Sequence, residues 1–331
     1  DSHQWLGAPH VNVNTKNRQQ QQPAPMKKSS PQRNSRYHCP NHQYVNGHWD
    51  EAGLEWIVND GACSLEPLTR QHFCQVLQGR NLLIVGDSVN QQLFDQMVVL
   101  LLSSAAANET VQIHQQQRIR ENVVPVHLSV PICDNDDQTR NRKQQLTFLR
   151  NDFLQRDQTL EQHVRGFHLV MPWHHLLATH GVVVLNTGAH VMELAAYQQT
   201  LTQLRDRFRD SGGPEVIFRT TPRGHIGCTT EERGPIRAVN DSDWQRFFPT
   251  EVYNYNRFPL YNQMAWETFS SSSTTPNLRV VDVATLTELR PDHHKRPPKD
   301  CLHYDPVHAG PIYRVWMQLI LNALRGNLDP W

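Results

Sequence analysis

A short apolar run that stops at a serine constrains the fold of this chain more than any other feature. Residues 82–85 are Leu, Leu, Ile and Val, and Gly86 and Asp87 interrupt the run. From Ser88 to residue 100 the apolar side chains recur at the spacing of a helix. The pattern predicts a buried strand, a tight turn and a helix that begins at Ser88.

The position of Ser88 has two interpretations. A serine at a helix N-terminus can simply cap the helix. The same place offers free backbone N–H groups and the positive end of the helix dipole, which suit a nucleophile and the oxyanion it generates. A second motif favours the nucleophile, because Asp300 and His303 are close enough in sequence for the carboxylate to orient the imidazole. We therefore predict a Ser–His–Asp triad of Ser88, His303 and Asp300.

These motifs resemble those of a known family. Gly-Asp-Ser near the start and Asp-x-x-His near the end are typical of the SGNH/GDSL hydrolase superfamily. Three stretches are more narrowly similar to its PC-esterase branch, which includes the trichome-birefringence-like polysaccharide O-acetyltransferases of plants. They read Gly-Arg-Asn-Leu-Leu-Ile-Val-Gly-Asp-Ser at 79–88, Asn-Thr-Gly-Ala-His at 186–190 and Arg-Thr-Thr-Pro-Arg-Gly-His at 219–225.

The chain departs from the family pattern at two places. Family members usually carry an arginine just after Gly-Asp-Ser, where this chain has Asn90, Gln91 and Gln92. The block after Asp-x-x-His usually reads Trp-Cys-x-Pro-Gly, and here residues 304–310 read Tyr-Asp-Pro-Val-His-Ala-Gly. These departures concern the contacts to acyl donor and acceptor more than the triad.

The resemblance implies an enzyme that moves acetyl groups from a donor to the hydroxyls of a glycan or polysaccharide through acetyl-Ser88, without a cofactor or a metal. An esterase with the same triad, which uses water as the acceptor, is the alternative. A catalytically silent glycan-binding protein on the same fold is a third interpretation, and the complete triad argues against it.

The resemblance also assigns further site residues. The backbone N–H groups of Ser88 and Gly188 would form the oxyanion hole, with the Asn186 side chain as an added donor. Alternatively, Asn-Thr-Gly is only a turn that ends a strand. Four residues at the same strand ends are candidates for substrate contact: Asp87, His190, Arg219 and His225. For Arg219 and His225, a structural role in tying loops together is the stronger interpretation.

Cysteine and charge content limit the partners and the compartment. Lys plus Arg equal Asp plus Glu at 32 each, which argues against nucleic acid or an anionic membrane surface as the main partner. The six cysteines form no Cys-x-x-Cys pair and the His-His pairs lack further ligands, so disulfides are expected rather than a metal site. Fifteen pairings are possible for six cysteines. We expect Cys228 and Cys301 to pair, because both lie in loops at the active-site edge.

The compartment follows from the same features. Disulfides and the sequons at Asn108 and Asn240 indicate an oxidising secretory compartment. No apolar run is long enough to span a membrane. The resemblance implies a Golgi-lumenal or secreted protein whose membrane anchor precedes this chain.

The chain is predicted to divide into three parts. Residues 1–36 are rich in Asn, Gln, Pro, Lys and Ser, which predicts a disordered polar stem. Residues 37–80 carry three cysteines, and the resemblance implies a disulfide-tied collar packed on the catalytic domain. Residues 81–331 form the catalytic domain.

Strands and helices alternate along the catalytic domain. The predicted strands are 82–85, 111–114, 123–130, 181–185, 215–219 and 278–283, and the predicted helices are 89–100, 148–164, 191–208, most of 241–270, and 310–324. Alternation of this kind predicts a parallel sheet with helices on both faces, a three-layer α/β/α fold like that of SGNH hydrolases. The candidate residues follow strands and therefore converge on the carboxyl edge of the sheet.

Overall fold

A computed structural model of the chain describes residues 39–61, 63–102, 127–133, 144–154, 164–165, 168–191, 193–209, 212–225, 228, 235–236, 255–269, 277–297, 299–305 and 308–325. All of them belong to one compact unit, Arg36–Trp331. The predicted stem, the strand at 111–114, the first part of the strand at 123–130, both sequons and residues 241–254 lie outside the described residues.

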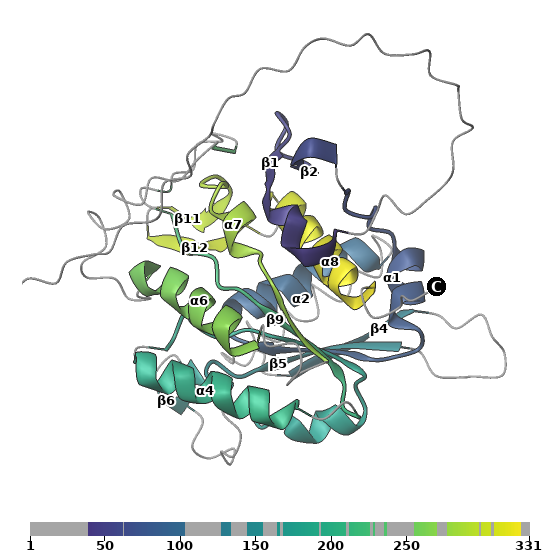
Figure 1. Cartoon of the computed structure of the whole chain (residues 1–331), viewed down its shortest axis with the longest axis vertical. Helices are drawn as coiled ribbons and strands as arrows, with labels where there is room; N and C mark the ends of the chain where they lie inside the picture. The colour runs from purple at the N-terminus through teal and green to yellow at the C-terminus, as the bar shows by residue number, and fades with distance from the viewer. Residues whose placement is uncertain are drawn as a thin grey trace, which may run out of the picture. The chain divides into compact units, whose positions relative to one another are not determined.

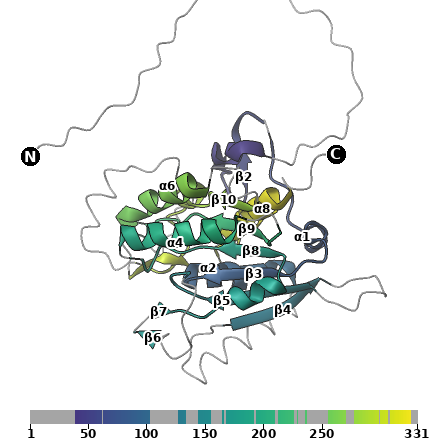
Figure 2. The ribbon, with the colours of Figure 1, turned by 60° about the horizontal axis from the view of Figure 1, so that its bottom comes forward.

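A six-stranded sheet in the order β10-β9-β8-β3-β5-β4 forms the centre of this unit (Figures 1 and 2). Neighbouring strands are parallel from β10 to β5, and β4 is antiparallel to β5. Every residue of β3 and β8 is buried, as expected for strands covered on both faces. The predicted mixed α/β fold with a mainly parallel sheet is confirmed. The strands are β3 (Leu82–Gly86), β4 (His127–Cys133), β5 (Gln144–Arg150), β8 (Val182–Leu185), β9 (Glu215–Arg219) and β10 (Leu278–Val281).

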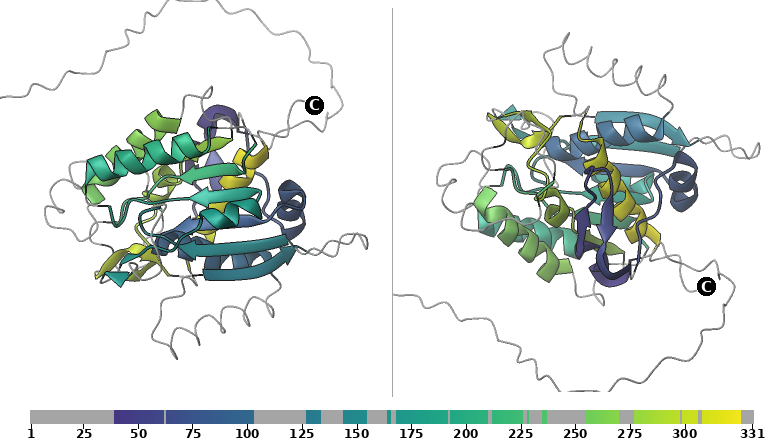
Figure 3. Two further views of the ribbon diagram at one scale, coloured as in Figure 1. Left: turned by 90° about the horizontal axis from the view of Figure 1, so that it is seen from below. Right: turned by 90° about the horizontal axis from the view of Figure 1, so that it is seen from above.

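Helices cover the sheet from two sides. Helices α2 (Ser88–Leu101) and α8 (Gly310–Arg325) lie on one side, and α4 (Leu194–Arg207) lies on the other (Figures 1 and 3). Helix α6 (Phe258–Phe269) packs against α4 and β10, and α1 (Arg70–Leu77) packs against β4 and α8. A short helix α7 (Ala284–Thr287) follows β10. The predictions for α2, α4 and α8 agree with the structure to within three residues at each end.

One predicted element is wrong. Residues 148–164 were expected to form a helix, but residues 148–150 belong to β5, and Asn151 continues it with a single bridge to Val170. Residues 164 and 165 form the short strand β6 (Val164–Arg165), which pairs with β7 (His168–Leu169), and 155–163 are outside the described residues. β5 is inserted between β3 and β4, and burial there outweighs a helical spacing of only a few apolar residues.

The collar predicted at 37–80 contains a 3-10 helix, η1 (Pro40–Val45), and a small hairpin, β1 (Gly47–Trp49) and β2 (Trp56–Val58). The Cys39–Cys63 disulfide closes this segment. Trp49 Nε1 donates to Leu286 O at 2.9 Å, and the Tyr44 hydroxyl accepts from Asp282 N at 2.9 Å. The segment thus packs on the chain that leaves the last strand of the sheet, β10.

All six cysteines are paired, as Cys39–Cys63, Cys74–Cys133 and Cys228–Cys301. The expected disulfides are therefore present, the Cys228–Cys301 pair among them. Three disulfides are typical of a protein that folds in an oxidising, secreted or lumenal environment. Among the residues that the structure describes, no helix combines the length and the apolar character needed to cross a membrane.

Candidate active site

Ser88 begins α2 directly after the central strand β3. Asp87, and not Ser88, caps the helix, because Asp87 Oδ1 accepts from Val89 N at 2.9 Å. The turn requires glycine at 86, where a Cβ atom would lie 2.5 Å from Asn90 Nδ2 and 2.6 Å from Asn186 O. The Ser88 hydroxyl is therefore not used as a cap and is available for other contacts.

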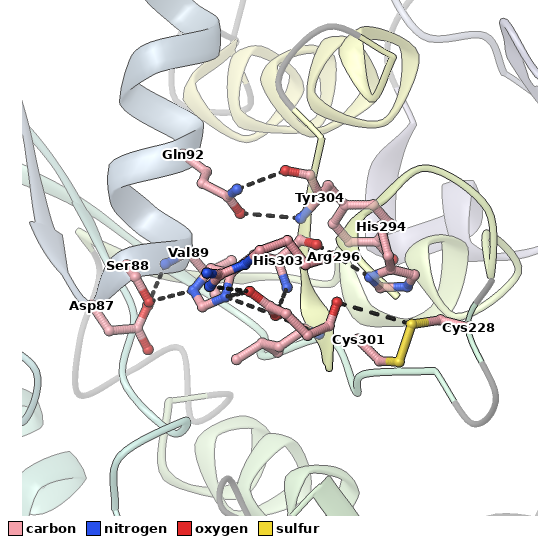
Figure 4. Close-up of polar contacts among 12 residues, drawn as sticks. Asp87, Ser88, Val89, Gln92, Cys228, His294, Arg296, Cys301, His303 and Tyr304 are labelled. Atoms are coloured by element: carbon pink, nitrogen blue, oxygen red, sulfur yellow. Dashed lines mark hydrogen bonds and ion pairs between the residues drawn. A yellow bond between two sulfur atoms is a disulfide. The ribbon is translucent and has the colours of Figure 1, made fainter. Parts of the chain in front are cut away.

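His303 and Asp300 lie on a hairpin outside the main sheet, made of β11 (His294–Arg296) and β12 (Asp300–Tyr304). The His303 ring connects the two other triad members (Figure 4): Nε2 is 2.6 Å from Ser88 Oγ, and Nδ1 is 3.0 and 3.1 Å from the two Asp300 oxygens. Ser88 and His303 are 215 residues apart in sequence. The structure thus brings the three predicted residues into one hydrogen-bonded relay.

The charge on Asp300 fixes the direction of this relay. Burial alone would raise the pKa of the Asp300 carboxyl, but the hydrogen bond and charge of His303 and the backbone N–H groups of His303 and Leu302 hold it well below its usual range. A carboxylate accepts only, so Nδ1 of His303 carries the proton and donates it. When the ring is neutral, Nε2 carries no hydrogen and accepts from the Ser88 hydroxyl, the arrangement that a general base requires.

Gly188 follows β8 and lies beside the same edge of the sheet. A Cβ atom at this position would be 2.7 Å from Thr221 Oγ1, so only glycine fits without displacing that neighbour. The Asn186 side chain does not serve as the expected oxyanion donor here. Its Nδ2 group donates to Arg219 O at 2.8 Å and to Thr221 Oγ1 at 2.9 Å, and the residue is fully buried. Both of its N–H bonds are therefore used inside the protein.

Arg219 is fully buried beneath the Ser88 turn, not on a substrate surface. Its guanidinium donates to Asn90 Oδ1 at 2.7 and 2.9 Å and to Asn186 Oδ1 at 2.8 Å, and lies 4.8 Å from the ring centre of Trp316. Burial lowers the pKa of Arg219 to about 10, and the negative charge of Asp87 opposes that shift. Asp87 is also fully buried. Both residues therefore hold the turn and have no exposed surface for substrate.

The two remaining substrate candidates are also buried. His190 Nε2 lies 3.9 Å from Asp152 Oδ2, next to the end of β8. His225 Nε2 lies 3.0 Å from Glu288 O, and its Nδ1 is 2.6 Å from His294 Nε2. Burial lowers the pKa of His225 to about 4 and that of His294 to about 3. The pair of His225 and His294 joins the hairpin to the segment after β9, because His294 is the first residue of β11 and its Nδ1 is 3.3 Å from His303 O.

Figure 4 shows two further contacts that hold this hairpin from outside. The Cys228–Cys301 disulfide joins β12 to the segment after β9. On the other side, Gln92 on α2 meets the backbone of Tyr304. The sequence interpretation noted Gln92 only as a departure from the family pattern. The sequence does contain a signal for its contact with the hairpin: Gln92 lies four residues after Ser88, and residues four apart share a helix face.

A wide groove of about 1740 Å³ lies at the opposite edge of the sheet. Its lining includes Asn81, Gly181 and Glu215, which are next to the amino ends of β3, β8 and β9. The relay is at the carboxyl ends, so this groove is not its substrate site. Over the described part of the chain, no group of three or more His, Cys, Asp or Glu side chains could hold a metal ion.

No family model matches the chain. The chemistry therefore has to be inferred from the geometry. A serine at a helix N-terminus, a neutral imidazole within hydrogen-bond distance of its hydroxyl and a carboxylate on the far ring nitrogen form a set that can generate a serine nucleophile.

Proposed function

We propose that this protein is a serine-dependent acyltransferase of the SGNH type that moves acetyl groups onto hydroxyls of a glycan. The observation that carries the proposal is the relay from Ser88 through His303 to Asp300, with 2.6 Å between Ser88 Oγ and His303 Nε2. Its position at the carboxyl edge of a mainly parallel sheet, with the serine at the start of a helix, supports the SGNH assignment.

The reaction consists of two displacements at one carbonyl. His303 Nε2 takes the Ser88 proton while Ser88 Oγ attacks the acetyl ester of the donor. The tetrahedral oxyanion receives N–H bonds from Ser88 and Gly188. The intermediate then collapses, the donor's alkoxide leaves with the proton from His303, and acetyl-Ser88 remains. Asp300 keeps its negative charge throughout and offsets the positive charge on the imidazolium.

In the second displacement a glycan hydroxyl gives its proton to His303 and attacks acetyl-Ser88. Collapse releases the acetylated glycan, and His303 returns the proton to Ser88 Oγ. When water takes the place of the glycan, the same steps make an acetyl esterase. The three stretches similar to plant polysaccharide O-acetyltransferases favour the transferase. A silent binding protein would have no use for the complete relay.

The compartment proposed for this activity is the Golgi lumen or the exterior of the cell. The three disulfides support a secretory route. The resemblance to the plant enzymes supports the Golgi. Polysaccharide precursors and acetylated donors would both have to be present there.

The test is to follow acetyl groups in both directions. The protein is incubated with an acetylated polysaccharide, and separately with an unacetylated polysaccharide plus an activated acetyl ester, and acetyl content is measured by mass. A transferase adds acetyl to the glycan faster than it releases acetate. Release of acetate alone identifies the esterase. Absence of both reactions, with no acetyl-Ser88 trapped by rapid acid quench, overturns the proposal.

A further inference from the structure

We infer that Gln92 is a positioning residue that holds the base hairpin at the correct distance from the nucleophile, an inference that rests on the proposed function. Gln92 lies on α2 four residues after Ser88, so the two side chains leave the same face of the helix. Figure 4 shows both pointing toward β12, Ser88 toward His303 and Gln92 toward Tyr304, the next residue.

The Gln92 amide engages both backbone groups of Tyr304. Nε2 donates to Tyr304 O at 2.7 Å, and Oε1 accepts from Tyr304 N at 3.4 Å. β12 belongs to a sheet of two strands and pairs with β11 only, so these two backbone groups face α2 and not another strand. The primary amide acts there as a substitute for one residue of a neighbouring strand.

The amide is itself oriented by a third contact. The hydroxyl of Tyr313, a fully buried residue of α8, donates to Gln92 Oε1 at 3.0 Å. Tyr304 O can only accept, so the nitrogen of the amide faces it and the oxygen faces Tyr304 N and the Tyr313 hydroxyl. Gln92 therefore presents a fixed donor and a fixed acceptor to the strand that carries the base.

The consequence is geometric. His303 precedes Tyr304 directly, so a shift of the Tyr304 backbone moves the imidazole relative to Ser88 Oγ, from which it is 2.6 Å away. Misplacement of a catalytic group by about 1 Å can cost about 100-fold in rate. Loss of the contacts between Gln92 and Tyr304, here called the Gln92 clamp, should therefore lower turnover while substrate affinity stays the same, because the Gln92 amide is occupied by Tyr304 and Tyr313.

The test uses Gln92→Met and Gln92→Glu beside a matched control. Gln318→Met is the control, because Gln318 on α8 is also half-buried and donates to a backbone carbonyl, that of Glu66, at 2.7 Å, away from the relay. Methionine keeps the length and removes both bonds. Glutamate keeps the acceptor and loses the donor to Tyr304 O. Hydrolysis of a chromogenic acetyl ester gives kcat and KM, and thermal unfolding gives Tm.

We expect Gln92→Met to lower kcat about 10- to 100-fold, with KM within about twofold of wild type and a Tm close to that of Gln318→Met. Gln92→Glu should lower kcat at least as much as Gln92→Met, because its second carboxylate oxygen faces Tyr304 O and repels it. Gln318→Met should retain wild-type kcat. A kcat for Gln92→Met equal to that of Gln318→Met overturns the inference while the proposed function stands. Equal losses of kcat in both variants, in step with Tm, also overturn it.

A second measurement does not depend on turnover. The proton on His303 Nδ1, held by Asp300, gives a downfield NMR resonance in the resting protein. It should shift or broaden in Gln92→Met and stay unchanged in Gln318→Met. The wild-type protein could prove inactive toward every acetyl ester while the resonance still differs between Gln92→Met and Gln318→Met. That outcome would refute the function and leave the positioning role in place. An unchanged resonance in Gln92→Met would refute the positioning role.

Discussion

The proposed nucleophile, Ser88, and the proposed base, His303, are held in different ways. Ser88 follows β3, a strand buried along its whole length, and the turn is fixed by the buried Asp87 and Asn90. His303 belongs to a two-stranded hairpin outside the main sheet, held by the Gln92 clamp, a disulfide and a buried histidine pair. The nucleophile therefore depends on the protein core, whereas the base depends on a few side-chain contacts.

This difference separates two kinds of defect. A change beneath Ser88 breaks buried polar contacts and should cost mainly stability. A change in the hairpin supports should move His303 and cost mainly turnover. Substitutions on the two sides of the relay can test that separation, provided that activity and unfolding are measured on the same variants.

The largest effect is expected for Ser88→Ala, which removes the nucleophile itself. Turnover should fall on the order of 10⁶-fold, as for other serine nucleophiles of such triads. Since Asp87 caps α2, the free energy of unfolding should change by less than about 0.5 kcal/mol. Ester hydrolysis and urea unfolding measure the two quantities. Wild-type turnover in this variant would remove Ser88 from the mechanism.

Asp300→Asn should have the next largest effect, a fall in turnover of roughly 10⁴-fold. The amide can present an N–H to His303 Nδ1, which favours the wrong tautomer, while glycan binding measured by calorimetry should remain. Asp305→Asn is the control, because Asp305 Oδ1 lies 3.1 Å from His308 Nδ1 instead. Near-normal turnover for Asp300→Asn with a collapse for Asp305→Asn would assign the third position of the triad to Asp305.

The same contrast explains what could be predicted from the sequence. Strand β3, its turn and α2 are contiguous, so the apolar run, Gly86 and the helical spacing were sufficient to place Ser88 at a helix N-terminus. The alternation of strands and helices was sufficient to predict that the candidate residues lie at the carboxyl edge of the sheet. Asp300 and His303 were identified from their spacing, but the hairpin on which they lie was not predicted, because β11 and β12 are short and largely polar.

The sequence pattern did not predict contacts between residues that are far apart in the chain. Asn186 was expected as an added oxyanion donor or as part of a strand-ending turn; its amide donates to Arg219 O and Thr221 Oγ1, which fits the turn, and nothing in Asn-Thr-Gly indicates those partners. The helix expected at 148–164 failed because the position of β5 between β3 and β4 determines burial there. The roles of Arg219 and His225 as internal ties, the stronger interpretation from the sequence, agree with their burial.

Arg219→Met tests the nucleophile side of the comparison through stability. The substitution leaves the side-chain oxygens of Asn90 and Asn186 without their donor, and each buried unsatisfied acceptor costs about 1–3 kcal/mol. We expect a loss of about 3 kcal/mol in the free energy of unfolding, measured in urea. Arg205→Met, on exposed α4 surface where the arginine pairs with Asp206, should stay within about 0.5 kcal/mol. Equal values for the two variants would contradict the core-based account of Ser88.

Replacing both Cys228 and Cys301 by serine tests the base side. A native disulfide typically contributes about 2–4 kcal/mol, so unfolding should become easier by about that amount. Removing Cys39 and Cys63 in the same way is the matched control, since that pair closes the collar. Both double variants should lose stability, but only the first should also lose turnover at temperatures well below Tm. Loss of turnover in both, or in neither, would mean that the hairpin does not depend on this bond.

A pH dependence of stability is expected from the buried pair of His225 and His294. Two neutral imidazoles carry two N–H groups for three contacts, to Glu288 O, to each other and to His303 O. The longest contact, 3.3 Å from His294 Nδ1 to His303 O, is the one that lacks a hydrogen in the neutral pair. The pair therefore fits the fold in its neutral form, in agreement with pKa values lowered by burial to about 4 and about 3.

The sign of the pH effect follows from those values. In the unfolded chain these histidines bind protons below about pH 6.5, and in the folded protein they do so only below about pH 4 and about pH 3. Their stabilising contribution is thus complete above about pH 6.5 and declines as pH falls toward 4, by about 1.4 kcal/mol per histidine for each pH unit. Asp292 and Asp300, whose pKa values are lowered, lose their contribution only below about pH 4, so the two effects separate.

Urea unfolding between pH 4.5 and 7.5 should show a flatter pH slope for His294→Gln than for wild type, whereas the exposed His48→Gln should keep the wild-type slope. A His294→Gln slope identical to wild type would mean that His294 binds protons alike in the folded and unfolded chains, which would contradict a pair held in its neutral form by burial.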